Sequence, residues 1–216
     1  AQVVPPDFVP KPFPDLNEAS DEALIGYLKH PSAVYRLHSQ WELVRRGSKR
    51  DGKARLQGIV AVAGDRTAPL YGRVAALYTL AQMSPASVAG LTTLYSKDPQ
   101  LREFPLRAIT DRRGATKADS NFFVAGLKDA NPRVRAQALI SLGRLGDPKV
   151  AKSILPLTVR ESEFEIPTRK PLYNEPDPGR VIPHLAVQAL VAVGEVEACL
   201  KALDGPYQDG AQWALK

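Results

Sequence analysis

Residues 129–143 read DANPRVRAQALISLG, and this stretch decides the fold of the chain. Pro132 follows Asn131, a pairing that marks a helix start, because a polar N-cap accepts the free amides of the first turn and proline supplies the preset φ of the first helical position. Apolar residues then recur at helical spacing, at Val134, Ala138, Leu142 and Leu145. The stretch therefore predicts an amphipathic helix with one buried face.

The same kind of helix-boundary signal recurs along the chain. Proline follows a short polar residue or a glycine at Ser84-Pro85, Asp98-Pro99, Asn131-Pro132, Asp147-Pro148 and Gly205-Pro206. Glycine follows a helical pattern, where a left-handed residue is needed, at Gly47, Gly114, Gly146 and Gly194. These marks predict helical hairpins at about 20–47, 48–83, 84–114, 115–146 and 147–194, with a partial sixth from 195. Because no segment alternates with period two, we predict no sheet.

The second helix of each predicted hairpin carries a narrow apolar stripe. In the second hairpin we place this stripe at Leu70, Val74, Leu77 and Ala81. A hairpin with so narrow a stripe cannot enclose a core of its own, but stacked neighbours can. The pattern therefore predicts an α-solenoid.

The fourth hairpin also resembles a known family, because Asp129 stands six residues before Arg135, as in the signature of HEAT (armadillo-like) repeats. The resemblance implies that both residues belong to a ladder of polar contacts between neighbouring repeats. The signature weakens elsewhere, since His30 stands six residues before Arg36. Arginines 36, 73, 102 and 135 are separated by 37, 29 and 33 residues, shorter than the ~40 to 47 of longer HEAT and armadillo repeats. We expect an all-α, right-handed α-solenoid of about five to six HEAT-like helical hairpins of the short bacterial type.

A second resemblance covers nearly the whole chain. Residues 12–16 (PFPDL), 21–47 and 177–194 are similar to the helical module of large bacterial haem-binding, dehydrogenase-like proteins, which join a β-propeller, a HEAT array and a c-type cytochrome. This chain has one cysteine, Cys199, and so lacks the Cys-x-x-Cys-His motif of such cytochromes. The resemblance implies a module of a larger multidomain bacterial protein, periplasmic or exported, with no cofactor of its own. We expect Cys199 to be a buried core residue.

Two proline-rich segments interrupt the helical pattern. Residues 1–15 are expected to form an extended leader, which leaves residues 16–216 as the HEAT-like repeat domain. Residues 161–179 (ESEFEIPTRKPLYNEPDPG) contain four prolines and predict a long loop inserted in the fifth hairpin. Such a long connection is usually functional or disordered, and we expect it to be a contact region through Arg169 and Tyr173.

The sequence lacks the common catalytic and metal-binding motifs. The three histidines, His30, His38 and His184, do not form an i, i+4 pair that would bind a metal. No nucleophile elbow, phosphate loop or dinucleotide fingerprint occurs. No apolar run approaches the ~18 residues needed to span a bilayer. We therefore expect no enzymatic activity, no cofactor, no metal and no membrane partner.

The predicted function is a protein-binding or scaffolding domain, because a solenoid presents a long surface and this one lacks catalytic residues. Its partner would be another protein or the neighbouring domains of the same polypeptide, and the array could equally act only as a spacer between domains. The expected contact residues lie off the apolar stripes of the second helices: Tyr35, His38, Glu42, Tyr71 and Arg73.

The alternative is nucleic-acid binding of the HEAT-like DNA glycosylase type. The net charge is +6, and residues 36–73 hold nine Lys or Arg against three acids. Such a segment attracts phosphates or forms a solvated helix face. Since exposed aromatic residues are not interleaved with the basic ones, we expect nucleic-acid binding less than protein binding.

Overall fold

The structure, a computed structural model, describes residues 7, 9, 12–47, 52–83, 91, 98–111, 119–159 and 178–216. Every regular element in these ranges is helical. The chain divides into two compact units, residues 1–83 and 84–216, which we call unit 1 and unit 2. The boundary between them falls between the second and third predicted hairpins.

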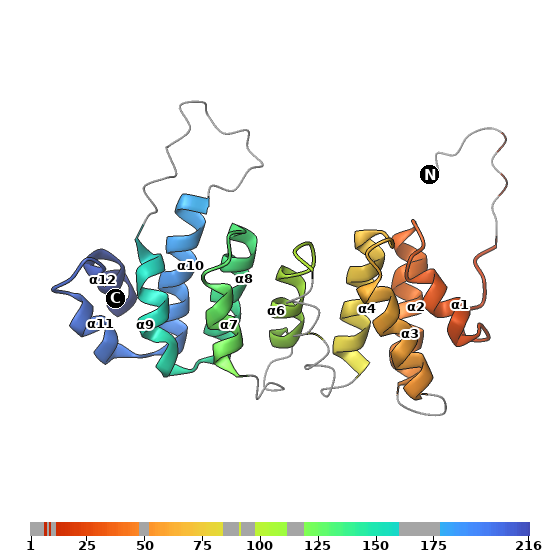
Figure 1. Ribbon diagram of the computed structural model, residues 1–216, viewed down its shortest axis with the longest axis horizontal. Helices are drawn as coiled ribbons and strands as arrows, with labels where there is room; N and C mark the ends of the chain where they lie inside the picture. The colour runs from red at the N-terminus through yellow and green to blue at the C-terminus, as the bar shows by residue number, and fades with distance from the viewer. Residues whose placement is uncertain are drawn as a thin grey trace. The chain divides into compact units, whose positions relative to one another are not determined.

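Unit 1 contains two helical hairpins, which Figure 1 shows in red to yellow. Its helices are α1 (Asp21–Tyr27), α2 (Ala33–Arg46), α3 (Gly52–Gly64) and α4 (Leu70–Met83). Helix α1 packs against α2 and α3 against α4, while the second helices, α2 and α4, also pack against each other. The two hairpins therefore stack as the repeat pattern predicts.

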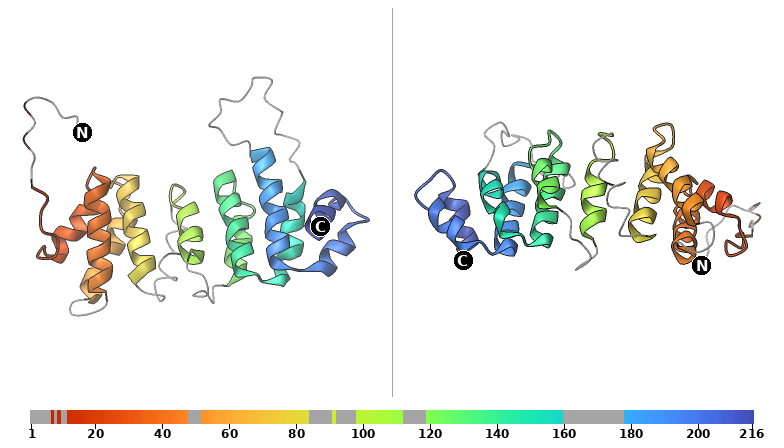
Figure 2. Two further views of the ribbon diagram at one scale, coloured as in Figure 1. Left: turned by 180° about the vertical axis from the view of Figure 1, so that it is seen from behind. Right: turned by 60° about the horizontal axis from the view of Figure 1, so that its bottom comes forward.

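Unit 2 repeats this arrangement, as the two views in Figure 2 show. Its elements are α6 (Glu103–Thr110), α7 (Ser120–Gly126), α8 (Pro132–Leu145), η2 (Pro148–Val150), α9 (Ala151–Ile154), η3 (Leu155–Thr158), α10 (Pro178–Val193), α11 (Val196–Ala202) and α12 (Gln208–Leu215). Helix α8 packs against α6, α7 and α10, and α10 also contacts α9, η3 and α12. The all-α, stacked-hairpin architecture is thus confirmed.

Several predicted helix boundaries are confirmed at atomic detail. The side chains of Asn131 and Asp147 are N-caps that accept the amides of Arg133 (3.0 Å) and Lys149 (3.1 Å). Glycines 47, 146 and 194 have φ of 56°, 65° and 72°, values that favour glycine over residues with a Cβ. The Ser84-Pro85 turn and Gly114 lie outside the described residues.

Burial confirms one predicted stripe and corrects another. In α8, Val134, Ala138 and Leu142 are buried, and Leu145 at the end of the helix is half-buried. In α4 the expected one-sided stripe is wrong, because Leu70 is exposed whereas buried residues occur around most of the helix. The reason is that α4 packs on both α2 and α3, so more than one side is covered.

The C-terminal predictions have mixed outcomes. Cys199 is buried, as expected, and burial raises the pKa of its thiol, with the Glu195 carboxylate acting in the same direction. Most of the predicted loop at 161–179, including Arg169 and Tyr173, lies outside the described residues, and α10 already begins at Pro178. Among the helices that the structure describes, none is long and apolar enough to cross a membrane.

Candidate binding surface on the first two hairpins

The position of α2 is fixed by an arginine that closes its hairpin turn. Arg36 Nη1 donates to the carbonyl oxygens of His30 (2.7 Å) and Pro31 (2.6 Å). His30 Nδ1 accepts the amide of Ser32 at 3.1 Å, which orients the imidazole within the turn. Charged donors make strong hydrogen bonds, so the start of α2 is held against the end of α1.

Helix α2 has an apolar face that the other helices of unit 1 do not cover. Its inner side buries Ser39 and Leu43. On the outer side Val34, Leu37 and Trp41 are 52%, 45% and 56% exposed. Their spacing of i, i+3 and i+7 places them on one face of the helix. We call Val34, Leu37 and Trp41 the α2 apolar face.

A groove runs between α2 and the segment that precedes α1. It has a volume of about 390 Å³ and is lined by residues 13–17 on one side and by His38, Trp41, Glu42 and Arg45 on the other. The ring of Phe13 lies 4.8 Å from that of Tyr35 and 5.3 Å from that of His38, measured between centroids. Trp41 meets His38 edge-on at 4.9 Å. The α2 groove is therefore lined by aromatic rings next to the α2 apolar face.

Of the predicted contact residues, His38 lines this groove, and Tyr35 contacts the ring of Phe13. Tyr35 is half-buried, because its ring stacks on His30 at 4.1 Å and meets Tyr27 at 5.5 Å. His38 is exposed, as its place on the outer side of the helix predicts. Of the two, only His38 is exposed.

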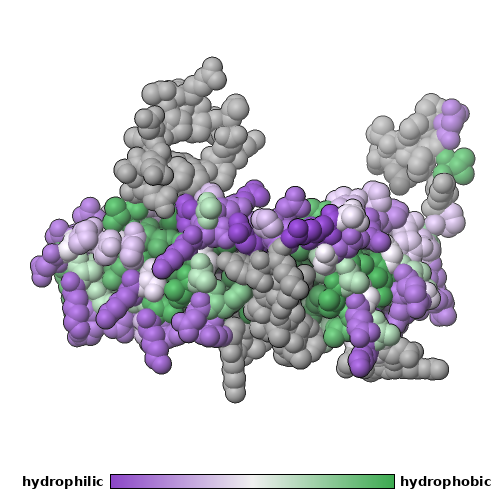
Figure 3. All heavy atoms as spheres, in the orientation of Figure 1, coloured by the Kyte–Doolittle hydropathy of each residue, from purple (hydrophilic) through white to green (hydrophobic). Residues whose placement is uncertain are grey.

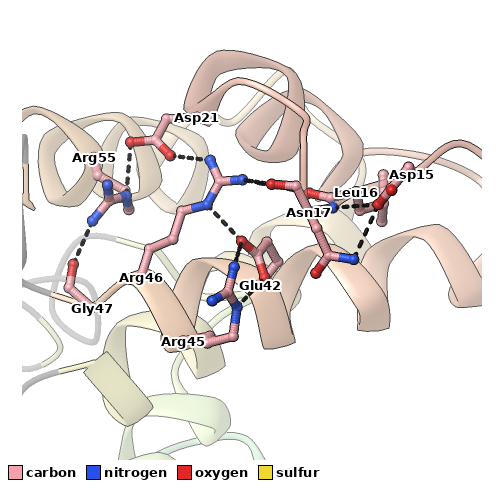
Figure 4. A network of polar contacts seen from close by, with 9 residues as sticks. All are labelled: Asp15, Leu16, Asn17, Asp21, Glu42, Arg45, Arg46, Gly47 and Arg55. Atoms are coloured by element: carbon pink, nitrogen blue, oxygen red, sulfur yellow. Dashed lines mark hydrogen bonds and ion pairs between the residues drawn. The ribbon is translucent and has the colours of Figure 1, made fainter.

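The expectation that Glu42 lies on an exposed side of its helix is wrong, because Glu42 is 5% exposed and belongs to an internal ion network (Figure 4). Its carboxylate accepts from Arg45 Nε (2.6 Å) and Nη2 (2.7 Å) and from Arg46 Nε (2.7 Å). The hydrogen bond from Arg45, with further help from Arg46, lowers the pKa of Glu42, although burial opposes this change. Glu42 is therefore buried within unit 1 and does not lie on an exposed face of α2.

The network continues from Arg46 to the other helices of unit 1 (Figure 4). Arg46 donates to Asp21 (2.8 Å) and to the carbonyl oxygen of Asn17 (2.9 Å). Asp21 also accepts from Arg55 Nε at 2.7 Å, and Arg55 donates to the carbonyl oxygen of Gly47 at 2.6 Å. One carboxylate thus joins α1 to α2 and α3.

Helix α4 extends the exposed surface beyond α2. The guanidinium of Arg36 lies over the Tyr71 ring at 4.5 Å, and Gln40 donates to the carbonyl oxygen of Ala75 at 2.9 Å. Tyr71 is exposed, and Figure 3 shows hydrophobic atoms over α4 among hydrophilic ones. The prediction that Arg73 lies off the buried side is wrong: it is 2% exposed and donates to the carbonyl oxygen of Ala63 at 3.3 Å, because α4 packs closely on α3.

In unit 2 the Asp129 and Arg135 pair forms two separate contacts. Arg135 Nη1 donates to the backbone oxygens of Asp129 (2.9 Å) and Ala130 (3.3 Å), so it closes its own hairpin turn. The Asp129 carboxylate pairs instead with Arg102 of the preceding segment at 3.1 Å and accepts the amide of Asn131 at 2.8 Å. Asp129 therefore makes a contact towards the preceding repeat, and Arg135 closes the turn of its own repeat.

The sequence reasoning missed the residues that make the surface apolar: Phe13, Val34, Leu37 and Trp41. A signal for three of them was present, because Val34, Leu37 and Trp41 form a second apolar stripe on the helical wheel of residues 33–46. The contact of Phe13 depends on the path of the chain before α1, which periodicity does not reveal. Within the described residues, no group of three or more His, Cys, Asp and Glu side chains is placed to hold a metal ion.

Comparisons with known proteins identify a fold. No family model matches the chain, and no curated protein matches it. A structure that addresses microtubule plus-end tracking by XMAP215, CLIP-170 and EB1 is similar over 89% of this chain and 88% of that one, at 16% identity and a TM-score of 0.52. A designed armadillo repeat protein aligns over 91% and 98% (14% identity, TM-score 0.45), and human deoxyhypusine hydroxylase over 88% and 83% (16% identity, TM-score 0.32).

None of these comparisons supports the likeness to haem-binding, dehydrogenase-like proteins. At 16% identity, a TM-score above one half shows the fold alone. Together with the stacked hairpins of both units, it shows that the chain has the fold of a HEAT/armadillo-like α-solenoid.

Proposed function

We propose that this chain is a non-catalytic, protein-binding scaffold domain that contacts its partner through the α2 apolar face. The observation that carries the proposal is the exposure of Val34, Leu37 and Trp41 on one side of a single helix. Contiguous exposed apolar side chains mark interaction sites more often than isolated ones, and tryptophan is enriched among residues that dominate binding energy. Tyr71 on α4 and His38 beside Trp41 widen the surface.

The charges of unit 1 favour a protein partner over nucleic acid. Arg46 and Arg55 pair with Asp21, and Arg45 and Arg46 pair with Glu42. Arg36 is directed to the carbonyl oxygens of its own turn. Four of the nine Lys and Arg residues in 36–73 are thus directed to acceptors within unit 1. We therefore do not advance the DNA glycosylase alternative.

The partner belongs to one of two classes, a separate protein or a neighbouring domain of the same polypeptide. The second class follows from the resemblance to multidomain bacterial proteins, and it would make the domain a periplasmic or exported module. Arg169 and Tyr173 remain proposed as an additional contact region.

A photo-crosslinking experiment tests the proposal. A benzophenone amino acid at position 37 should yield an adduct with a protein in the native host, because this position lies on the α2 apolar face. The same amino acid at position 60 is the control, since Val60 is an exposed apolar residue on α3, a first helix of the same unit.

The adduct must then be confirmed with the purified partner. Leu37→Asp should weaken its binding by about tenfold or more, because it places a charge in an apolar contact, whereas Val60→Asp should leave it unchanged. Equal crosslinking at positions 37 and 60, or equal loss of affinity in both variants, would contradict the proposal.

A further inference from the structure

One wall of the α2 groove, residues 13–17, is a peptide segment of the chain itself. Residues 12–14 read Pro-Phe-Pro, and Phe13 lies against Tyr35 and His38. Proline fixes φ and has no amide donor, so a proline-flanked residue is extended at a small entropic cost and suits a groove lined by aromatic rings. The contact shows which chemistry this groove accepts.

The segment is held firmly at one end and loosely at the other. Leu16 is buried, Arg46 donates to the carbonyl oxygen of Asn17 at 2.9 Å, and Asp15 accepts the amide of Asn17 at 2.9 Å. Phe13, in contrast, is 45% exposed, although it lies on two rings. The Phe13 side chain can therefore leave the rings of Tyr35 and His38 while residues 15–17 stay in place.

The groove also has room beyond Phe13. Trp41 lies on the same wall and is exposed, and the volume of about 390 Å³ is open to solvent between residues 13–17 and α2. A tryptophan and a histidine in edge contact offer both ring faces and ring edges to an incoming aromatic side chain. The groove thus continues from the site of Phe13 into the α2 apolar face.

We propose that the α2 groove recognises an extended, proline-flanked aromatic peptide of the partner, and that Phe13 of the chain's own Pro12–Pro14 segment covers the rings of Tyr35 and His38 beside the groove until this peptide displaces it. The proposal rests on the proposed function, since it names the chemistry of the partner at the same surface. Residues 12–14 then act as an internal competitor that weakens the apparent affinity of the groove.

The test uses the full 216-residue chain and a synthetic fluorescein-labelled peptide with the sequence of residues 9–18, VPKPFPDLNE, followed by fluorescence anisotropy. Phe13→Ala removes the internal competitor and should bind the peptide about fivefold or more tightly than the unchanged chain. A peptide in which alanine replaces its phenylalanine should not bind. Because Phe13 is half exposed, the substitution should leave the fold intact, and circular dichroism verifies this.

Two tryptophan variants locate the site. Trp41→Ala, combined with Phe13→Ala, should weaken peptide binding by about tenfold or more, since tryptophan dominates such contacts. Trp213→Ala is the matched control, because Trp213 is an exposed tryptophan on α12 of unit 2. Loss of binding through Trp213→Ala, or no saturable binding to Phe13→Ala, would overturn the inference.

Other outcomes separate this inference from the proposed function. If the unchanged chain forms dimers that Phe13→Ala abolishes, residues 12–14 of a second copy contact α2. The inference that these residues contact α2 of their own chain would then be refuted. If the peptide fails to bind but Leu37→Asp still removes partner binding, only the peptide chemistry is wrong. If Leu37→Asp also has no effect, the proposed function itself fails.

Discussion

Units 1 and 2 connect their helices with different polar contacts. In unit 1 one carboxylate, Asp21, receives Arg46 and Arg55 from two other helices. Among the described residues of unit 2, the contacts between neighbouring segments are distributed over different carboxylates: Arg102 contacts Asp129 at 3.1 Å, and Arg144 contacts Asp111 at 2.6 Å, which Arg107 of the same helix also contacts at 3.4 Å. Unit 1 therefore depends on one shared acceptor, whereas unit 2 distributes the same task.

The units agree in one respect that the repeat signature hides. Arg36 and Arg135 each donate to the backbone oxygens of the residues five and six positions earlier. The residue six positions earlier is His30 for Arg36 and Asp129 for Arg135. The arginine thus recognises the shape of the hairpin turn and not a particular side chain. This explains how the first hairpin keeps its geometry with His30 in place of aspartate.

The largest expected effect comes from removing the shared acceptor of unit 1. Asp21→Asn should lower the free energy of unfolding by about 2 to 3 kcal/mol, because it removes the carboxylate that the buried Arg55 and the half-buried Arg46 share, and Arg46 then pairs with Glu42 alone. Asp111→Asn in unit 2 should cost less than about 1 kcal/mol, since Arg144 and Arg107 are partly exposed there. Urea denaturation followed by circular dichroism measures both, and equal losses would refute the difference between the units.

A close backbone approach gives the next effect. A Cβ on Gly72 of α4 would lie 3.0 Å from Lys29 Cα and 3.1 Å from the Leu28 carbonyl oxygen. Gly72→Ala should therefore destabilise unit 1 by about 1 to 3 kcal/mol, because backbone atoms must shift. Gly143→Ala in α8 should be neutral or stabilising by up to about 1 kcal/mol, since its Cβ would meet neighbours at 3.4 Å and alanine favours helix. Thermal melting of both variants checks the order, and a stable Gly72→Ala would contradict the close packing.

The shared role of the two arginines predicts matched losses. Arg36→Ala and Arg135→Ala should each lower the free energy of unfolding by about 1 to 2 kcal/mol, because each removes two charge-assisted hydrogen bonds to a hairpin turn. Hydrogen exchange should show faster exchange in residues 28–33 for the first variant and in residues 127–132 for the second. An effect of Arg135→Ala alone would show that the aspartate signature matters more than the turn.

The smallest effect depends on pH. Since the pKa of Glu42 is lowered in the folded chain, its ionised form stabilises the fold above the ordinary value of 4.5, and this contribution disappears as pH falls through the folded-state pKa. Glu42→Gln should therefore be less stable than the unchanged chain by about 1 kcal/mol at pH 7, with a gap that closes in acid.

Asp147 in unit 2 is the comparison for this pH dependence. The Ser120 hydroxyl donates to its carboxylate at 2.8 Å and lowers its pKa, with the backbone amide of Lys149 acting in the same direction. Asp147→Asn should give a smaller change of the same sign, because the group is at the surface. Urea titrations at pH 3, 5 and 7 measure the stability difference between each variant and the unchanged chain. A difference that widens in acid would contradict the predicted sign.

The sequence predicted the helix starts at Asn131 and Asp147 because their chemistry is local, whereas α6 and α12 begin at Glu103 and Gln208, a few residues after the predicted starts at Asp98-Pro99 and Gly205-Pro206. The N-caps Asn131 and Asp147, each followed by proline, and the glycines with positive φ act within one turn of the chain. Neighbouring residues alone are sufficient to specify such positions. The existence of stacked hairpins follows from them.

The candidate site was predicted less well, because it depends on which helices pack together. Arg73 and Glu42 lie off one apolar stripe but are buried by other contacts, namely the packing of α3 on α4 and the ion network around Arg46. A helical wheel treats each helix as packed on one side only, whereas α4 packs on both α2 and α3. The position of Phe13 on α2 joins residues more than twenty positions apart, which local patterns do not contain.

The most direct test of the central claim is the affinity of the crosslinked partner for one charged variant in each unit. Leu37→Asp lies on α2 and Val191→Asp on α10, and both residues are exposed apolar side chains of second helices. The account predicts that Leu37→Asp weakens binding by about tenfold or more in an isothermal titration, while Val191→Asp binds as the unchanged chain does. A loss in Val191→Asp with full affinity in Leu37→Asp would contradict the assignment of binding to unit 1.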